Sequence, residues 1–257
     1  MNYIRRQSFR APLHLSKPHE DEGALVVNMV TPTAGVFDDD EIDIRVDVEE
    51  RARLVLTAPS SSRVYRSRDG NHATVLQTFR VASGGSMEFY PEPFIPHAGA
   101  RYHQKNNLHV ASDASLLFFE WLSPGRVASG ESFQYEQLRW DTNIWQNERL
   151  LVRECYTLSP RDSSLSSMRM TYENAHYLAC FALGEFATSF PQEEIEALGQ
   201  DNESIYLGCG RLSEGNGWTI KALCADSLTT RRTMARLREL IYRASPDGGK
   251  CPHLGRF

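Results

Sequence analysis

The chain has 257 residues, 41% of them hydrophobic and 24% charged, which supplies enough apolar mass for a folded core and excludes wholesale disorder. A formal net charge of -5 gives no overall attraction to nucleic acid or to an anionic membrane. The five cysteines are scattered without a C-x-x-C pair, so neither a disulfide framework nor a zinc ribbon is indicated. We find no apolar run of secretory or membrane-spanning character and expect a cytoplasmic protein.

The first two thirds of the chain alternate between apolar and polar residues with a period of two, as half-buried strands do. In "EIDIRVDVEE" (41–50) the isoleucines and valines fall on one face and the charged residues on the other. Similar runs occupy 52–58, 75–81, 86–92, 101–110, 115–122, 132–140, 149–158 and 167–173, with turn signals at 67–71, 82–86, 123–125, 142–148 and 159–164. Strands at this spacing predict an all-β sandwich, barrel or solenoid.

The last third changes character and predicts two helices. "FPQEEIEALGQ" (190–200) has Pro191 at a helix start and Gly199 as a stop. "ADSLTTRRTMARLRELIYRAS" (225–245) offers Asp226 or Ser227 as N-cap, followed by apolar residues at helical spacing opposite an arginine-rich face. Strand-like runs at 204–212 and 217–225 separate the helices. Because no linker divides the chain, we expect one domain over 1–257, strand-rich at about 24–175 and mixed at about 176–245.

Common catalytic signatures are missing from the sequence. We find no G-x-S-x-G elbow, no H-E-x-x-H and no Rossmann G-x-G-x-x-G. "DGGKC" (247–251) fails as a phosphate loop, because Ala244 stands where the first glycine is needed and Cys251 follows the lysine. The chain is therefore not expected to hydrolyse ATP or GTP.

Three histidines, His97, His103 and His109, lie at six-residue intervals in "EPFIPHAGARYHQKNNLHV" (92–110) and raise the question of a metal site. A strand rising about 3.3 Å per residue places His103 and His109 on one face but roughly 20 Å apart, too far to share an ion. His97 and His103 form the better pair, since residues 98–100 allow a turn between them. The alternative is three histidines that face solvent or are satisfied by hydrogen bonds.

Carboxylates provide the other candidate chemistry. Glu88 and Glu92 form a pair, and a β-rich glycoside hydrolase using paired carboxylates is an alternative function. Glu120 lies within the apolar run "SLLFFEWL" (115–122), so it faces either solvent or a lined interior that supplies a partner. Cys251 and His253 near the end of the chain are a possible two-ligand fragment whose role the sequence does not define.

Four motifs in order resemble the D-type urease accessory proteins (UreD, called UreH in some organisms). The first is "TPTAGVFDDDEIDIRVDVEE" (31–50), in which Thr31 replaces the family's Asn. The second is "LVLTAPSSSRVYRS" (54–67), and the third is "MEFYPEPFIPHAGARYHQ" (87–104). The fourth is "GRVASGESF" (125–133). The resemblance covers about residues 31–158.

This resemblance implies a strand-rich, superhelical two-sheet β fold with two C-terminal helices and a scaffold that is not an enzyme. Such proteins hold an F-type accessory protein, which recruits a nickel-carrying GTPase of the G type. The assembly docks on apo-urease and passes Ni(II) toward an active site whose lysine becomes carbamylated. No tightly bound cofactor, nucleic acid or membrane is implied, and an adaptor without any metal role is a further alternative.

Transfer of a cation requires ligands that are weak and spaced, because a site that binds nickel tightly would also stop it. The candidates for transient nickel contact are Glu88, Glu92, His97, His103 and Glu120. The alternative for each is a surface or supporting position without nickel contact. The candidates for partner binding are Tyr65, Arg66, Arg126, Arg232 and Arg236.

Overall fold

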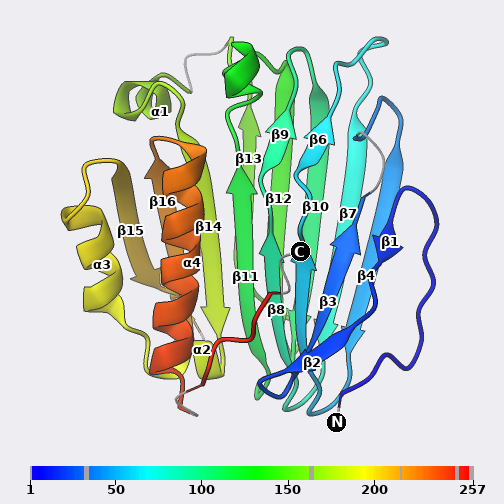
Figure 1. Cartoon of the computed structure of the whole chain (residues 1–257), viewed down its shortest axis with the longest axis vertical. Helices are drawn as coiled ribbons and strands as arrows, with labels where there is room; N and C mark the ends of the chain where they lie inside the picture. Colours follow the sequence, from blue (N-terminus) through cyan, green and yellow to red (C-terminus); the bar gives the residue numbers. More distant parts are fainter. Residues whose placement is uncertain (1, 32–34, 162–164, 215, 247–248, 255–257) are drawn as a thin grey trace.

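The computed structural model describes residues 2–31, 35–161, 165–214, 216–246 and 249–254. It is mainly β, as predicted, with two packed sheets and helices late in the chain (Figure 1). The first sheet contains β1 (His14–Leu15), β2 (His19–Asp21), β3 (Ala24–Val30), β5 (Arg53–Ala58), β6 (Ser62–Val64), β8 (Ser86–Pro91), β9 (Phe94–Pro96), β11 (Ser115–Leu122), β14 (His176–Leu183), β15 (Ile205–Arg211) and β16 (Gly217–Cys224). The second contains β4 (Glu41–Val48), β7 (Ala73–Val81), β10 (Arg101–Val110), β12 (Gln137–Gln146) and β13 (Arg149–Leu158). The helices are α1 (Ser166–Thr171), α2 (Glu185–Thr188), α3 (Gln192–Gln200) and α4 (Ser227–Ala244).

From β3 to β12 the chain passes back and forth between the two sheets. In the first sheet β3, β5, β8 and β11 are parallel neighbours. In the second sheet β4, β7, β10 and β12 are parallel neighbours as well. Each turn of the chain therefore adds one strand to each sheet, as in a solenoid in which every turn contacts only its neighbours. This confirms the predicted superhelical, two-sheet β fold.

The inner faces of the two sheets meet in the main hydrophobic core. Ile44, Phe79 and Leu108 of the second sheet face Leu116 and Phe118 of the first. In the second sheet every other residue points to solvent, which produces the period of two seen in the sequence.

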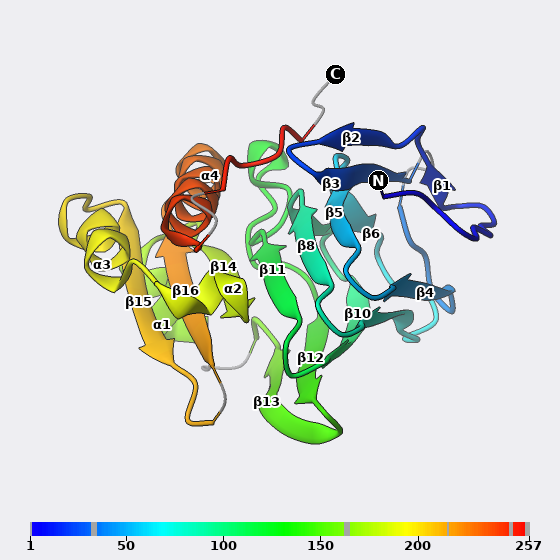
Figure 2. The ribbon, with the colours of Figure 1, turned by 90° about the horizontal axis from the view of Figure 1, so that it is seen from below.

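Beyond β11 the first sheet continues with antiparallel strands β14, β16 and β15, and helices cover its outer face (Figure 2). Leu117 and Phe119 of β11 pack there with Met234 and Leu237 of α4 in a second core. Strands β11 and β14 are thus buried on both faces. In the described part of the chain, each helix falls short of the length and apolarity that a membrane crossing requires.

A buried ion pair fixes α4 on the sheet. The helix begins at the predicted cap, where the Asp226 carboxylate accepts a hydrogen bond of 2.8 Å from the Thr229 amide. Near its far end the Arg238 guanidinium donates from both Nε and Nη2 to Glu88 of β8, and the Tyr242 hydroxyl donates to Glu88 Oε2 at 2.7 Å. Burial alone lowers the pKa of Arg238, but the Glu88 carboxylate raises it above its ordinary value, so the guanidinium stays charged.

The C-terminal segment runs back across the outer face of β3 and β5. Leu254 packs against Val26 and Val55, and the backbone amide of His253 donates to Asp21 Oδ2 at 2.6 Å. Residues 251–254 therefore act as a strap between the helical layer and the first turn of the solenoid (Figure 2).

The sequence predictions succeeded for the two long C-terminal helices and for most strands. The strand predicted at 167–173 is wrong, because Tyr172 donates its amide to the Met168 carbonyl and these residues form α1. The turn predicted at 142–148 is too long: β12 continues to Gln146, and only Asn147 and Glu148 turn, both with positive φ. Inward-facing Thr142 broke the apolar alternation that would have extended the strand prediction.

The ion pair between Glu88 and Arg238 gives the first testable prediction. Replacing Arg238 with Met leaves a buried carboxylate without its cation and should lower the free energy of unfolding by about 3–5 kcal/mol, as should Glu88→Gln. The double variant should lose much less than the sum of the single losses, because neither charge is then left alone. Urea unfolding of all four proteins measures this coupling. Additive losses would show that the contact does not hold α4 in place.

Candidate functional site

In-register pairing aligns polar side chains on the inner face of the second sheet. Gln77 of β7 pairs with Asn106 of β10, Asn106 with Thr142 of β12, and Thr142 with Glu154 of β13. Gln77, Asn106 and Thr142 are buried, and Glu154 is partly buried. We call these four residues the interior polar row. It crosses the middle of an otherwise apolar interior.

Glu120 of β11 faces this row from the opposite sheet. Its Oε1 accepts hydrogen bonds from Asn106 Nδ2 at 2.8 Å, Trp140 Nε1 at 2.9 Å and Thr142 Oγ1 at 2.6 Å. Its Oε2 is buried and has no hydrogen-bond partner among the described residues. Of the two positions predicted for Glu120, the structure therefore places it in a lined interior, with 4% of its surface exposed.

Burial raises the pKa of the Glu120 carboxyl, and the Lys221 ammonium opposes that rise. Lys221 is held by Glu154, the last member of the row, with 2.5 Å between Nζ and Oε2. Because an unpaired buried carboxylate is unfavourable, Glu120 keeps its proton to higher pH than an exposed glutamate does. The free Oε2 is the atom to which a proton or a cation can add.

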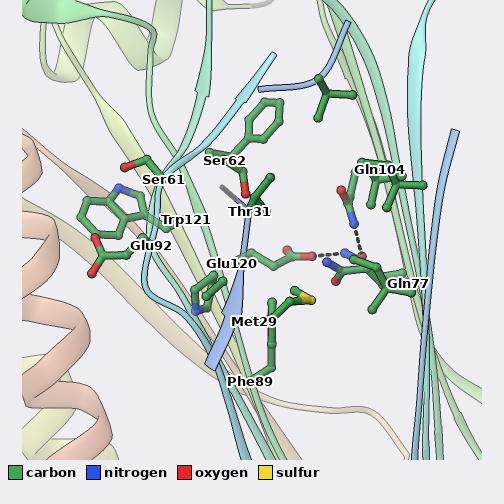
Figure 3. A pocket seen from close by; sticks show the side chains of 18 of the residues that line it. Met29, Thr31, Ser61, Ser62, Gln77, Phe89, Glu92, Gln104, Glu120 and Trp121 are labelled. Atoms are coloured by element: carbon green, nitrogen blue, oxygen red, sulfur yellow. Dashed lines mark hydrogen bonds between the residues drawn. The ribbon is translucent and has the colours of Figure 1, made fainter. Parts of the chain in front are cut away.

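A cavity of about 100 Å³ lies between the sheets beside Glu120. Figure 3 shows Glu120 reaching toward Gln77 and Gln104 across this space. Gln104 accepts a hydrogen bond from the Tyr102 hydroxyl and donates to Asn106 at 2.6 Å, so the polar contacts continue along β10. The cavity lining extends from Glu120 to residues 61–63, of which 62 and 63 are exposed. Because amide and carboxyl groups form part of an otherwise apolar lining, the cavity can hold water beside them.

The other two predicted carboxylates face the helical layer. Glu92 lines the same cavity, but its carboxylate points toward α4 (Figure 3), where Arg231 donates to it at 2.6 and 2.5 Å. Glu88 lies on the outer face of the first sheet in the ion pair with Arg238. Each of the two carboxylates is thus neutralised by its own arginine.

The histidines lie in separate places. His103 and His109 share the outer face of β10, as predicted, and His103 Nε2 lies 2.5 Å from Asp141 Oδ2. Although burial alone raises the pKa of Asp141, hydrogen bonds from Cys155, His103 and Arg139 lower it to about 2. The Asp141 carboxylate is therefore charged and fully engaged.

His97 lies instead on the turn before β10, where it lines a second cavity of about 470 Å³. Burial and the charge of Arg126 lower the pKa of His97, and its Nε2 has no hydrogen-bond partner among the described residues. Searched over the residues that the structure describes, no group of three or more His, Cys, Asp or Glu side chains could hold a metal ion.

The predicted partner-binding residues form two groups. Tyr65, Arg66 and Arg126 line the second cavity together with His97. Arg232 and Arg236 lie on the exposed face of α4. Nothing in the geometry joins the two groups into one surface.

Sequence reasoning missed the interior polar row and Lys221. The sequence did contain a signal for the interior polar row. Gln104 and Asn106 occupy the face of "RYHQKNNLHV" opposite the histidines, and Gln77 interrupts the apolar face of β7. An amide repeated at inward positions of adjacent strands is unexpected in an apolar core and marks a polar interior.

The chain is thus a two-sheet β solenoid with a helical layer on one side, and one row of polar residues crosses its apolar interior. A family model described as "UreD urease accessory protein" matches residues 2–252. The chain belongs to this family, which confirms the resemblance carried by the four motifs.

Three relatives illustrate the range of similarity. The urease accessory protein UreD of Opitutus terrae is 36% identical, over 93% of this chain and 88% of the relative. UreD of Sporosarcina pasteurii is 24% identical over 88% and 87% of the two chains, and UreH of Helicobacter hepaticus is 23% identical over 86% and 85%. Urease accessory proteins are maturation factors rather than enzymes, so the expectation of a non-enzymatic chain is confirmed and the glycoside hydrolase alternative is set aside.

The raised pKa of Glu120 gives a prediction for stability against pH. A carboxyl whose pKa is raised by folding contributes stability that is present below the unfolded pKa of about 4.3 and is lost as pH rises through the folded value. Glu120→Gln keeps an acceptor for the three donors and carries no charge. We expect its free energy of unfolding to rise relative to the wild type as pH increases above about 4.

Urea unfolding of the wild type and the variant across pH 4 to 8 measures this difference. The exposed Glu50→Gln change is the matched control. The difference in free energy of unfolding between this variant and the wild type should change little with pH. A difference between wild type and Glu120→Gln that stays constant with pH would contradict the raised pKa.

Proposed function

We propose that this chain acts in urease maturation as the scaffold of a cytoplasmic complex with an F-type accessory protein and a G-type GTPase, and that Ni(II) passes to apo-urease along its polar interior. The observation that carries the proposal is the buried Glu120 carboxyl, whose free Oε2 faces a cavity within a row of amide and hydroxyl groups. Nickel is cargo in this proposal, and no resident cofactor is needed.

The chemistry of the row suits passage rather than storage. Amide and hydroxyl oxygens are weak ligands for Ni(II), which prefers imidazole and thiolate donors. Gln77, Asn106 and Thr142 can therefore replace water around the ion without holding it. Glu154 is paired with Lys221, so the negative charge that compensates the loss of hydration at the most buried point comes from Glu120.

Protonation gives Glu120 two states that fit this role. When the row is empty, the raised pKa of Glu120 favours the neutral acid, which avoids an unpaired buried charge. An arriving cation displaces the proton, because a metal ligand must be deprotonated. Departure of the cation restores the neutral state, so the site does not become a trap.

Nickel contact by the other candidates remains a prediction. Glu92 lines the cavity and would have to leave Arg231 to bind a cation, and Glu88 would have to leave Arg238. His97 and His103 lie outside the interior polar row, in the second cavity and on the outer sheet face. We therefore assign the central contact to Glu120.

For partner contact we propose the exposed face of α4. Arg232 and Arg236 are exposed there, and Arg236 forms a surface ion pair with Glu239, with 3.2 Å between Nη1 and Oε2. Exposed pairs of this kind contribute little to stability, so these arginines are free to meet an acidic partner surface.

The nickel proposal predicts that Glu120→Ala and Glu120→Gln still form the accessory complex but activate urease several-fold more slowly, because the deepest point of the passage has lost its charge. Co-expression with the urease genes, followed by measurement of urease activity and of nickel per active site, tests this. Glu50→Ala is the surface control. Normal nickel content in urease matured with the Glu120→Gln variant would contradict the assignment of the central nickel contact to Glu120.

The partner proposal predicts that Arg232→Glu combined with Arg236→Glu weakens capture of the F-type protein and removes most of its salt dependence, since like charges then meet. Co-purification at low and high salt measures this. Reversal of Arg45 and Arg149, which lie away from α4, is the matched control. Unchanged capture would place the contact elsewhere.

A further inference from the structure

The second cavity is independent of the interior polar row and is built from three of the four sequence motifs. Tyr65, Arg66 and Ser67 follow β6, Ala98 and Gly99 precede β10, and Arg126 and Glu131 follow β11. The volume of about 470 Å³ exceeds that of the cavity at Glu120. Segments about 30 residues apart in the chain thus meet at one concave site on the solenoid.

The backbone holds Arg66 at this site. The amide of Ser67 donates to the Gly99 carbonyl at 3.0 Å, and Arg66 forms an isolated bridge with Ala100. The aliphatic part of Arg66 lies over Gly99, where an added Cβ would come within 3.0 Å of Arg66 Cγ. Gly99 also has φ of +72°, a conformation that other residues adopt with strain.

The charges of the lining are unbalanced. Arg66, Arg126 and Arg161 line the cavity together with Glu131 and Glu136. Glu131 forms an ion pair with Arg126, with 2.9 Å between Glu131 Oε2 and Arg126 Nε.

Glu136 is bound in turn by Arg101, which does not line the cavity, with 2.8 Å between Oε1 and Nη2. Among the described residues, Arg66 and Arg161 have no carboxylate within ion-pair distance. Both guanidiniums are exposed at the rim, where they can close on an anion.

The wall behind the rim also contains buried polar groups without protein partners. His97 Nε2 and Tyr135 Oη have no hydrogen-bond partner in the described residues, although both side chains are more than nine-tenths buried. Buried polar atoms of this kind lower stability unless a bound molecule or water satisfies them. Arg126 adds a positive charge beside His97, as Arg66 and Arg161 do at the rim.

We propose that this cavity binds a small oxyanion, a free phosphate or carboxylate, held by the guanidinium of Arg66 with Arg161. Planar guanidiniums match the paired oxygens of such anions, and fixed cations in a concave site concentrate them. The neutralised pair of Arg126 and Glu131 forms one wall and leaves the two rim arginines for the ligand. The site is separate from the nickel passage proposed above and does not depend on it.

The test is titration of the purified chain with inorganic phosphate and, separately, with citrate at constant ionic strength, followed by calorimetry and by thermal unfolding. Saturable binding and a rise in Tm are expected for the wild type. Arg66→Gln should weaken the affinity at least tenfold. Arg68→Gln, which removes the same charge two residues away and outside the cavity, should leave it unchanged.

Gly99→Ala provides a second variant that alters no charge, and it should also weaken binding because it displaces the Arg66 side chain. A response that does not saturate, or that is equal in Arg66→Gln and Arg68→Gln, overturns the proposal. So does saturable, Arg66-dependent binding of a peptide with a free C-terminal carboxylate when phosphate and citrate do not bind, since the anion then belongs to a partner protein.

Discussion

In-register parallel stacking is the constraint on which the rest of this structure depends. Because each turn of the chain places one strand on each sheet, equivalent positions of successive turns lie side by side. A polar residue at one inward position therefore has a neighbour at the same depth in the next strand. Gln77, Asn106 and Thr142 form a continuous row for this reason, and Glu120 on the facing sheet can reach two of them at once.

The helical layer supplies the partners of a buried charge on the first sheet. Strand β8 carries Glu88 on a face that would otherwise be apolar, and α4 returns about 150 positions later with the arginine and the hydroxyl that satisfy it. Strands β11 and β14 are packed on both faces in the middle of the first sheet. This packing sets the depth of Glu120, since Glu120 and the residues facing α4 alternate along the same strand.

Local pattern was sufficient to predict the fold where one face of a strand meets solvent. It failed at β14, whose continuous apolar run "HYLACFAL" has no alternation because both faces are buried. It failed at α1, where three spaced apolar residues imitate a strand. In "RYHQKNNLHV" the inward face carries Gln104 and Asn106 between apolar residues, but the histidines drew attention to the outer face. The ion pair of Glu88 with Arg238 joins residues too far apart for any local pattern to connect them.

The composition of the interior row is the physical basis of the proposed nickel passage. A second carboxylate or an imidazole beside Glu120 would complete a tight site for a divalent cation, but its neighbours are amide, hydroxyl and indole groups. Apolar side chains such as Phe89 and Phe118 line the same cavity and offer a cation nothing to bind. Glu92 lines the same cavity but is paired with Arg231, so a cation in this space would find one carboxyl without an ion-pair partner, Glu120, with weaker oxygen ligands beside it. In the proposed passage, the raised pKa of Glu120 makes a protonated, unoccupied carboxyl less costly than an unpaired carboxylate, and the weak oxygen ligands around it do not complete a tight site.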